Sequence, residues 1–443
     1  MMEIILTIFY CLLFVILIKR VPFFQTKHLS SNFLVVLFLI KVLCGIVLFF
    51  IYTYYYDRND ADIFRLFDDA KAIYSAFPDR MGDYCKMILG IGDGSTYFQE
   101  HYYNQMIYWT KAYNTNIFSD THFLIRFNAL VMLFSFGYFN VHTIFGSFLS
   151  FFGLFCIYKF FEKNTYSFHK LQAIILFLLP STLFWTSSVL KESYIICGIG
   201  IFIYSFFLLC QPSSIGKKIW YCFCFLFSIY LISHVKLYYL VILLPLCCTF
   251  LFNKKKNIQH PLITYALLIL ICIPATFFII QKSGYDILNM MAFKHNDMLN
   301  LAICKNAKVV SYEYLDSTWC SFIQFFPKAL FFALCFPLPF THHSLMMILS
   351  EVENIILLLW LVTMLALGFK KHIKYKNLFW FCFLFALGNV IIIGYCSPII
   401  GALVRYRSTT LPFFMLAALF LCDEYKLKKH TKNILKKLKI NSI

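Results

Sequence analysis

Long apolar runs recur along the whole chain and constrain its fold more than any other feature. Thirteen such runs lie between residues 3 and 422. Of the 443 residues 61% are hydrophobic and only 14% are charged, whereas a soluble domain averages about 25% charged residues. Runs of this length suit helices that cross a hydrocarbon core about 30 Å thick. They do not alternate between apolar and polar residues as the strands of a transmembrane β-barrel do. We therefore expect an all-α, polytopic transmembrane helical bundle.

The thirteen runs differ in how well they suit a membrane span. They cover residues 3–18, 32–55, 124–139, 142–161, 171–186, 190–210, 219–233, 237–252, 261–281, 322–340, 352–369, 377–396 and 408–422. Two are weak, because run 124–139 begins with Arg126 and Asn128 and run 322–340 contains Lys328 and three prolines. We expect both to form interfacial or half-inserted helices, which leaves about eleven spans.

The charged residues indicate how the chain is oriented. The segments between the runs fall into two sets, and one set, together with the tail 424–443, holds 22 of the 39 lysines and arginines. Since basic loops stay in the cytoplasm, we expect the N-terminus outside and the C-terminus inside. The long polar loops 56–123 and 282–344 are then extracytoplasmic. No linker divides the chain, so residues 1–443 are expected to form a single integral membrane domain.

The same distribution accounts for the formal net charge of +18 without a nucleic acid. The basic residues are spread over short segments beside apolar runs, and a basic tail beside a last span typically meets anionic lipid headgroups. We therefore expect anionic membrane lipids as partners of the tail, and no nucleic acid. Cys304 and Cys320 share the second long loop, where an extracytoplasmic location would allow a disulfide.

The first long loop opens with acidic residues directly after an apolar run. Asp62, Arg65 and Asp69 are spaced to share one face of a helix, and the apolar residues between them would form another face. We expect an amphipathic helix that lies on the membrane surface. A carboxylate of Asp62, Asp69 or Asp68 can then act as a general base for a sugar hydroxyl, or bind a divalent cation against a lipid phosphate. The alternative is an acidic face that only contacts water.

A second candidate site is a hairpin at residues 180–193, where two apolar runs meet. Its Lys191 and Glu192 are the only formal charges within residues 171–216. An ionisable pair this close to a membrane is costly unless it is used or neutralised. In the functional interpretation Lys191 binds a phosphate, and Glu192 or Trp185 lines a sugar pocket. In the structural alternative Glu192 marks the start of a helix and Lys191 extends to the interface.

A third candidate site lies at the predicted outer end of the last span. Arg405 and Arg407 stand there against the positive-inside trend. Because the planar guanidinium pairs well with phosphate oxygens, we expect both to bind phosphate or pyrophosphate. The alternative is that they only anchor the helix at the interface. Arg126 is a weaker candidate of the same kind.

Four further charged residues lie within or beside the runs. Lys41 is inside the second run, and we expect its amine to extend to the cytoplasmic surface. Lys236 is expected in a tight outer turn between two spans. Glu351 and Glu353 precede a long apolar run, and we expect them to mark the N-terminal end of its helix.

The order of these motifs resembles the layout of bacterial membrane proteins of surface-polysaccharide loci and, more distantly, of the GT-C superfamily of polyprenyl-phosphate-sugar glycosyltransferases. The motifs are the acidic group at 60–70, the Pro-Ser-x-x-x-Trp hairpin that ends in Lys191-Glu192, and the Arg-Tyr-Arg-x-x-x-x-Pro segment at 405–412. In GT-C enzymes an acidic residue on the first extracytoplasmic loop is the catalytic base or a metal ligand. The resemblance assigns that role to Asp62, Asp68 or Asp69. O-antigen polymerases, a class related in function, carry essential arginines on outer loops, which implies such a role for the two arginines of the third candidate site.

The leading hypothesis is an integral-membrane glycosyltransferase of the bacterial inner membrane. Its donor would be a polyprenyl-phosphate-linked sugar, its acceptor a glycan or a lipid-linked glycan, and its cofactor, where one is used, a divalent cation such as Mg²⁺ or Mn²⁺. The first alternative is an O-antigen or capsule polymerase. The second is a transporter or flippase of lipid-linked glycans, which would place its binding site near the bilayer midplane. The charged residues gather at the predicted outer surface, which favours an enzyme.

Overall fold

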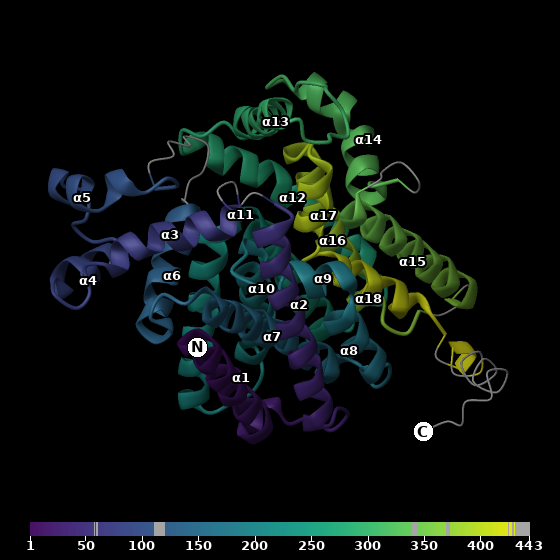
Figure 1. Ribbon diagram of the computed structural model, residues 1–443. Helices are drawn as coiled ribbons and strands as arrows, with labels where there is room; N and C mark the ends of the chain where they lie inside the picture. The colour runs from purple at the N-terminus through teal and green to yellow at the C-terminus, as the bar shows by residue number, and fades with distance from the viewer. Residues whose placement is uncertain are drawn as a thin grey trace. The chain divides into compact units, whose positions relative to one another are not determined.

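The described chain of this computed structural model is all-α, as its apolar runs predict (Figure 1). The structure describes residues 1–56, 58, 61–109, 120–338, 344–368, 373–423, 425–427 and 429. Within these residues the only β feature is an isolated antiparallel bridge between Val309 and Ile399. Asp60 of the acidic group and most of the basic tail lie outside the described residues.

Eight helices of the described residues are long and apolar enough to cross a membrane. They are α1 (Met2–Arg20), α2 (Ser31–Tyr54), α7 (Phe139–Asn164), α10 (Lys191–Leu209), α11 (Ile215–Lys256), α12 (Pro261–Lys282), α15 (Leu345–Gly368) and α16 (Lys376–Cys396). The chain is therefore a multi-pass membrane protein. The expected count of eleven spans is not confirmed. Two expected spans are merged in α11, and two others form the short helices α8 (His169–Leu178), α9 (Pro180–Trp185) and α18 (Leu411–Leu421).

Helix α11 is interrupted near its middle. It has 42 residues, and Lys236 within it is extended, with φ −155° and ψ 90°. A continuous helix of that length would be about 63 Å long, about twice the hydrocarbon thickness of a bilayer. On each side of the interruption the helix is long enough to form a span. The turn expected between these two spans is reduced to the interruption itself, without a longer loop.

The chain forms two compact units. Unit 1 comprises Met1–Lys159 and Thr182–Leu240, and unit 2 comprises Phe160–Ser181 and Val241–Ile443. Both units contain candidate spans.

In unit 1, short helices fill the segment between α2 and α7. They are α3 (Asp62–Tyr74), α4 (Met81–Leu89), α5 (Thr96–His101), the 3₁₀ helix η3 (Tyr103–Gln105) and α6 (Asp120–Ser135), whereas η1 (Pro22–Phe24) precedes α2. Figure 1 shows α3 lying beside α6, and the two pack closely. Helix α6 has 16 residues, fewer than the roughly 20 that a span needs.

The amphipathic helix expected after the second run is present as α3, but its apolar face is covered by protein. Ile63, Phe64 and Phe67 are each at most 2% exposed. Phe64 and Phe67 pack on Phe139, the first residue of α7, with ring centroids 4.9 and 5.1 Å apart. The expectation that this face lies on lipid is therefore wrong, because the start of α7 and helix α6 occupy it.

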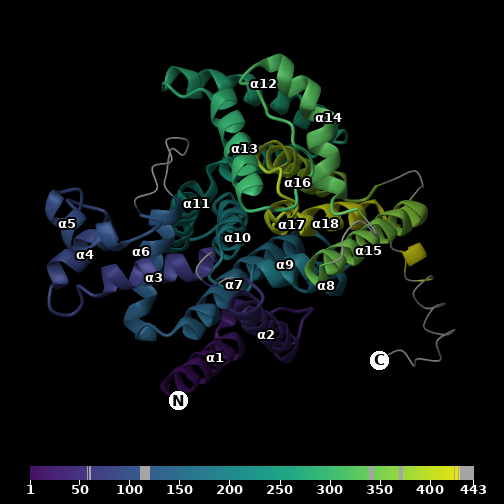
Figure 2. The same ribbon diagram turned by 45° about the horizontal axis from the view of Figure 1, so that its top comes forward.

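In unit 2, helix α16 is the common packing partner of its neighbours. It packs against α13 (Ile287–Cys304), α14 (Trp319–Cys335), α17 (Ile400–Arg407) and α18, and Figure 2 shows α13, α14 and α17 gathered around it. Helix α14 has 17 residues and contains Pro327. Cys304 and Cys320 are both exposed and free, so the disulfide that their loop would allow is not formed.

Candidate functional site

The polar face predicted for α3 is present, and Tyr108 lies across it. The Tyr108 hydroxyl donates a hydrogen bond to Asp62 Oδ1 at 2.8 Å. The backbone N–H groups of Ile107 and Tyr108 donate to Asp69 Oδ1 and Oδ2 at 2.9 and 2.7 Å. The Arg65 guanidinium lies 5.7 Å from the centroid of the Tyr108 ring. The structure therefore brings Asp62, Arg65 and Asp69 together, and it covers their face with the chain around Tyr108.

The three candidate carboxylates of α3 have different surroundings. Asp69 is 4% exposed, and burial raises its pKa although the backbone N–H groups act in the opposite direction. Asp68 is exposed and forms a 2.9 Å ion pair with Lys71. Asp62 is partly exposed and accepts its bond from a side chain. Asp69 therefore binds backbone N–H groups, and Asp68 faces water. Asp62 is a carboxylate that is both oriented by a hydrogen bond and accessible to solvent.

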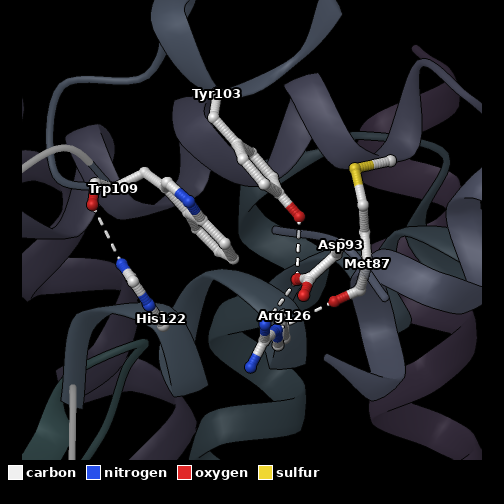
Figure 3. A network of polar contacts seen from close by, with 6 residues as sticks. All are labelled: Met87, Asp93, Tyr103, Trp109, His122 and Arg126. Carbon is white, nitrogen blue, oxygen red and sulfur yellow. Dashed lines mark hydrogen bonds and ion pairs between the residues drawn. The ribbon is translucent and has the colours of Figure 1, made fainter. Parts of the chain in front are cut away.

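Arg126, the weakest of the predicted phosphate ligands, is bound within unit 1 (Figure 3). Its guanidinium donates to Asp93 Oδ2 and to the Met87 carbonyl oxygen, both at 2.8 Å. The Tyr103 hydroxyl donates to the same Asp93 oxygen at 2.9 Å. Gly90, which is in the left-handed region with φ 67°, leaves space for the Arg126 guanidinium, because a Cβ at Gly90 would lie 2.8 Å from it. These contacts join α6 to α4 and to the chain that follows it.

Trp109 is held between two rings beside this ion pair (Figure 3). Its ring stacks on Tyr103 at 4.2 Å and on His122 at 4.0 Å. His122 Nε2 lies 2.9 Å from the Trp109 carbonyl oxygen, and burial lowers the pKa of His122. The neutral imidazole can donate this bond from Nε2. Residues 103–109 are therefore fixed by α6 on one side and by α3 on the other.

Sequence reasoning missed the residues that organise this site. Tyr103, Tyr108, Trp109 and His122 received no role, although the stretch from Tyr102 to Trp109 is rich in aromatic residues within a polar loop. That richness was the available signal. It did not show which carboxylate each ring would meet.

Lys191 and Glu192, predicted to bind substrate, are each paired with another segment of unit 1. Lys191 Nζ lies 2.6 Å from Asp120 Oδ2 at the start of α6. The Glu192 side chain is 1% exposed and lies 3.4 Å from Lys236 Nζ, at the interruption of α11. The two neighbours in sequence are therefore neutralised by separate partners. Lys236, expected in a turn between two spans, lies at the interruption of α11 and is the partly buried partner of Glu192.

The turn that precedes Lys191 is buried in unit 1. A Cβ at Gly45 of α2 would lie 2.0 Å from the Ser187 carbonyl oxygen, and one at Gly146 of α7 would lie 2.5 Å from that of Ser188. These glycines lie seven to nine residues from the nearest helix end, or about 10–14 Å along the axis. The turn of this hairpin is therefore packed between α2 and α7, away from the ends of both helices.

Lys41 and Trp185 lie beside this turn. The Lys41 residue is 1% exposed and its amine donates to Thr186 Oγ1 at 2.6 Å. The expectation that this amine reaches the membrane surface is therefore wrong, because it is bound inside unit 1. Trp185, the last residue of α9, is half-buried and contacts Phe184 edge to face.

The two arginines predicted to bind phosphate at the last span, Arg405 and Arg407, lie in unit 2. Arg407 is buried and bound to other groups of that unit. It is 1% exposed, and it donates to the carbonyl oxygens of Ala333 and Leu334 and to the Asn354 side chain. The last carbonyl groups of a helix need such donors, and α14 ends here. Arg405 is partly exposed, with its guanidinium 6.0 Å from the Tyr406 ring centroid.

Glu351 and Glu353 do not mark the end of a helix. Both lie inside α15 and are buried, at 5% and 4% exposed. Glu353 accepts hydrogen bonds from the backbone N–H and the hydroxyl of Ser181, at the start of α9. It therefore acts as a cap for another helix of the chain.

The described residues do not fit the divalent cation that the resemblance implies. They contain no group of three or more histidine, cysteine, aspartate or glutamate side chains that could hold a metal ion. Both Asp69 oxygens accept backbone N–H groups, and N–H donors repel a cation. His342 and His343 lie outside the described residues.

Comparison of the chain with protein-family models, with curated proteins and with solved structures gives no match. The chain is an all-α, multi-pass membrane protein whose predicted site residues are divided between two units.

Proposed function

We propose that the chain is an integral-membrane glycosyltransferase that uses a polyprenyl-phosphate-linked sugar on the extracytoplasmic face of a bacterial inner membrane. One observation carries the proposal: Asp62 is a partly exposed carboxylate, oriented by Tyr108, in the large polar segment that follows the second span. A general base has to be fixed in place and still reachable by the substrate. Asp68 is not fixed in place, and Asp69 is not reachable by the substrate.

In the proposed reaction Asp62 accepts the proton of the acceptor hydroxyl. The acceptor oxygen forms a bond to the anomeric carbon, and the bond from that carbon to the donor phosphate breaks with inversion. The electron pair leaves with the phosphate, whose charge a cation would stabilise. Lys191, which lies in the same unit as Asp62, is the proposed phosphate ligand; its amine is partly exposed beside Asp120. No step uses a metal ion.

The test compares Asp62→Asn with Asp68→Asn in the purified protein. The assay follows transfer from polyprenyl-phosphate sugars to a lipid-linked glycan acceptor. Loss of a general base should lower the rate on the order of 10²–10⁴-fold, and Asp68→Asn should transfer at about the wild-type rate because Asp68 only pairs with Lys71 at the surface. Normal turnover in Asp62→Asn would remove Asp62 from the reaction.

A transporter of lipid-linked glycans is the second candidate, and one observation favours it. The buried Glu192 pairs with the partly buried Lys236 where α11 is interrupted. Interrupted helices with ionisable residues are typical of transport sites. A labelled polyprenyl-phosphate sugar in vesicles that contain the protein distinguishes the two functions. A transporter moves this lipid across the bilayer without forming a glycan product. A polymerase would differ from the proposed transferase only in its acceptor.

A further inference from the structure

Tyr108 is hydrogen-bonded to α3 through both its backbone and its side chain. Its backbone N–H donates to Asp69 and its hydroxyl donates to Asp62. These carboxylates are seven residues apart, which is two turns of one helix face. The ring thus lies along the helix, with its backbone fixed at one carboxylate and its hydroxyl at the other.

The Tyr108 hydroxyl keeps its proton and donates it in the hydrogen bond. Burial raises the pKa of Tyr108 far above its usual value, and the negative charge of Asp62 raises it further. Arg65 acts in the opposite direction and lowers the pKa of Tyr108, through its charge and a hydrogen bond to the tyrosine side chain. A hydrogen bond from a neutral donor stabilises a carboxylate more than it stabilises the protonated acid.

We infer that Tyr108 is a positioning residue, whose hydroxyl orients the Asp62 carboxylate and stabilises its ionised form, and that Asp69 acts by fixing the backbone of Tyr108. The inference rests on the proposed role of Asp62 for its meaning in catalysis. The effect on Asp62 itself is a property of the folded protein and is measured without substrate.

The first experiment measures the protonation of Asp62 directly. A carbodiimide with a soluble amine labels protonated carboxyl groups, so labelling across a pH series, read by peptide mass spectrometry, gives a midpoint for each aspartate. Tyr108→Phe removes the donor and keeps the ring. Because a hydrogen bond to a charged group stabilises the charged form, the Asp62 midpoint should rise by about one to two pH units.

Tyr103→Phe is the matched control. Tyr103 belongs to the same segment and also donates its hydroxyl to one aspartate, Asp93. Its replacement should leave the Asp62 midpoint unchanged. Labelling of the exposed Asp68 serves as the internal reference in both variants. Equal Asp62 midpoints in wild type and Tyr108→Phe would overturn the inference.

A second variant tests the part played by Asp69 and protects the test against misfolding of the first. Asp69→Ala keeps the Tyr108 side chain intact but removes the carboxylate that accepts the backbone N–H groups of Ile107 and Tyr108. The Asp62 midpoint should rise here too, because the ring is no longer fixed. An unchanged midpoint in folded Asp69→Ala would show that Tyr108 holds its place without Asp69, and would overturn that part of the inference.

The transfer assay separates this inference from the proposed function. In Tyr108→Phe the acidic limb of the kcat/KM profile should move upward by the same amount as the labelling midpoint, while KM for the donor stays unchanged. A labelling shift together with full activity in Asp62→Asn would sink the proposed function and leave the inference intact. An inactive Asp62→Asn together with an unshifted Tyr108→Phe would do the reverse.

Discussion

Three aspartates within eight residues of α3 have three different roles in the structure. Asp68 forms an exposed ion pair, Asp69 binds two backbone N–H groups, and Asp62 accepts a phenol hydroxyl. The two arginines at the predicted last span also differ in their surroundings. Arg407 is buried against the end of α14, whereas Arg405 keeps partial exposure. Side-chain chemistry alone does not separate members of such a set, because their surroundings determine what each can bind.

Asp69 makes the stability of the protein depend on pH with a definite sign. Burial raises its pKa above the roughly 3.9 of an unfolded chain. Between these two values the folded state binds more protons than the unfolded state. The contribution of Asp69 to the free energy of unfolding therefore falls as pH rises from about 4 through the folded pKa.

The measurement is thermal unfolding of wild type and Asp69→Asn in detergent across a pH series. The free energy of unfolding of wild type minus that of the variant should decrease with rising pH, by about 1.36 kcal/mol for each unit by which the pKa is raised. Asp68→Asn serves as the control. A difference that grows with pH would contradict the buried environment described for Asp69.

At the scale of elements, backbone contacts join the helices of unit 1. The turn after α9 presses its carbonyl groups against Gly45 of α2 and Gly146 of α7. Small residues allow such close approach between membrane helices. The buried turn also receives the Lys41 amine through Thr186, so α2 contributes both space and a hydrogen-bond donor.

Gly45→Ala should destabilise the protein, because its Cβ would lie 2.0 Å from the backbone oxygen of Ser187. Overpacking typically costs about 1–3 kcal/mol, and backbone cannot move aside as a flexible side chain can. Gly216→Ala is the matched control, since Gly216 is also helical and a Cβ there meets nothing within 4 Å. Thermal unfolding in detergent gives the comparison. Equal midpoints for both alanine variants would contradict the close approach.

At the scale of the whole molecule, eight candidate spans and the distribution of basic residues bear on how the chain crosses the membrane. We expect eleven crossings, with the N-terminus outside and the C-terminus in the cytoplasm. This count requires α11 to cross twice. It also requires the α8–α9 pair and α18 each to cross once.

Single cysteines at Ser95 and Ser442, in a cysteine-free background, test this topology. An impermeant thiol reagent applied from outside should label Ser95→Cys, because Ser95 belongs to the first long polar segment and is exposed. It should leave Ser442→Cys, in the basic tail, unlabelled until the cells are opened. The opposite pattern would invert the orientation and place Asp62 on the cytoplasmic side.

The membrane class and the main helices could be predicted from the sequence, because they depend on local composition. A run of apolar residues lowers its free energy in lipid whatever its neighbours are, so each of the eight candidate spans corresponds to apolar runs in the sequence. Helix α3 and its polar face also follow from spacing alone. Span counting failed where composition is ambiguous, as at the interruption of α11 by Lys236.

The roles of individual polar residues were decided by tertiary structure. Tyr108 is 46 residues from Asp62, and Lys236 is 44 residues from Glu192. A buried polar group has to find a partner or pay a desolvation cost, but the sequence does not say which distant group meets that need. The apolar pattern thus determined that this chain enters a membrane as helices. Only folding decided that Asp69 holds backbone, that Arg126 holds Asp93, and that Asp62 is left oriented and within reach of solvent.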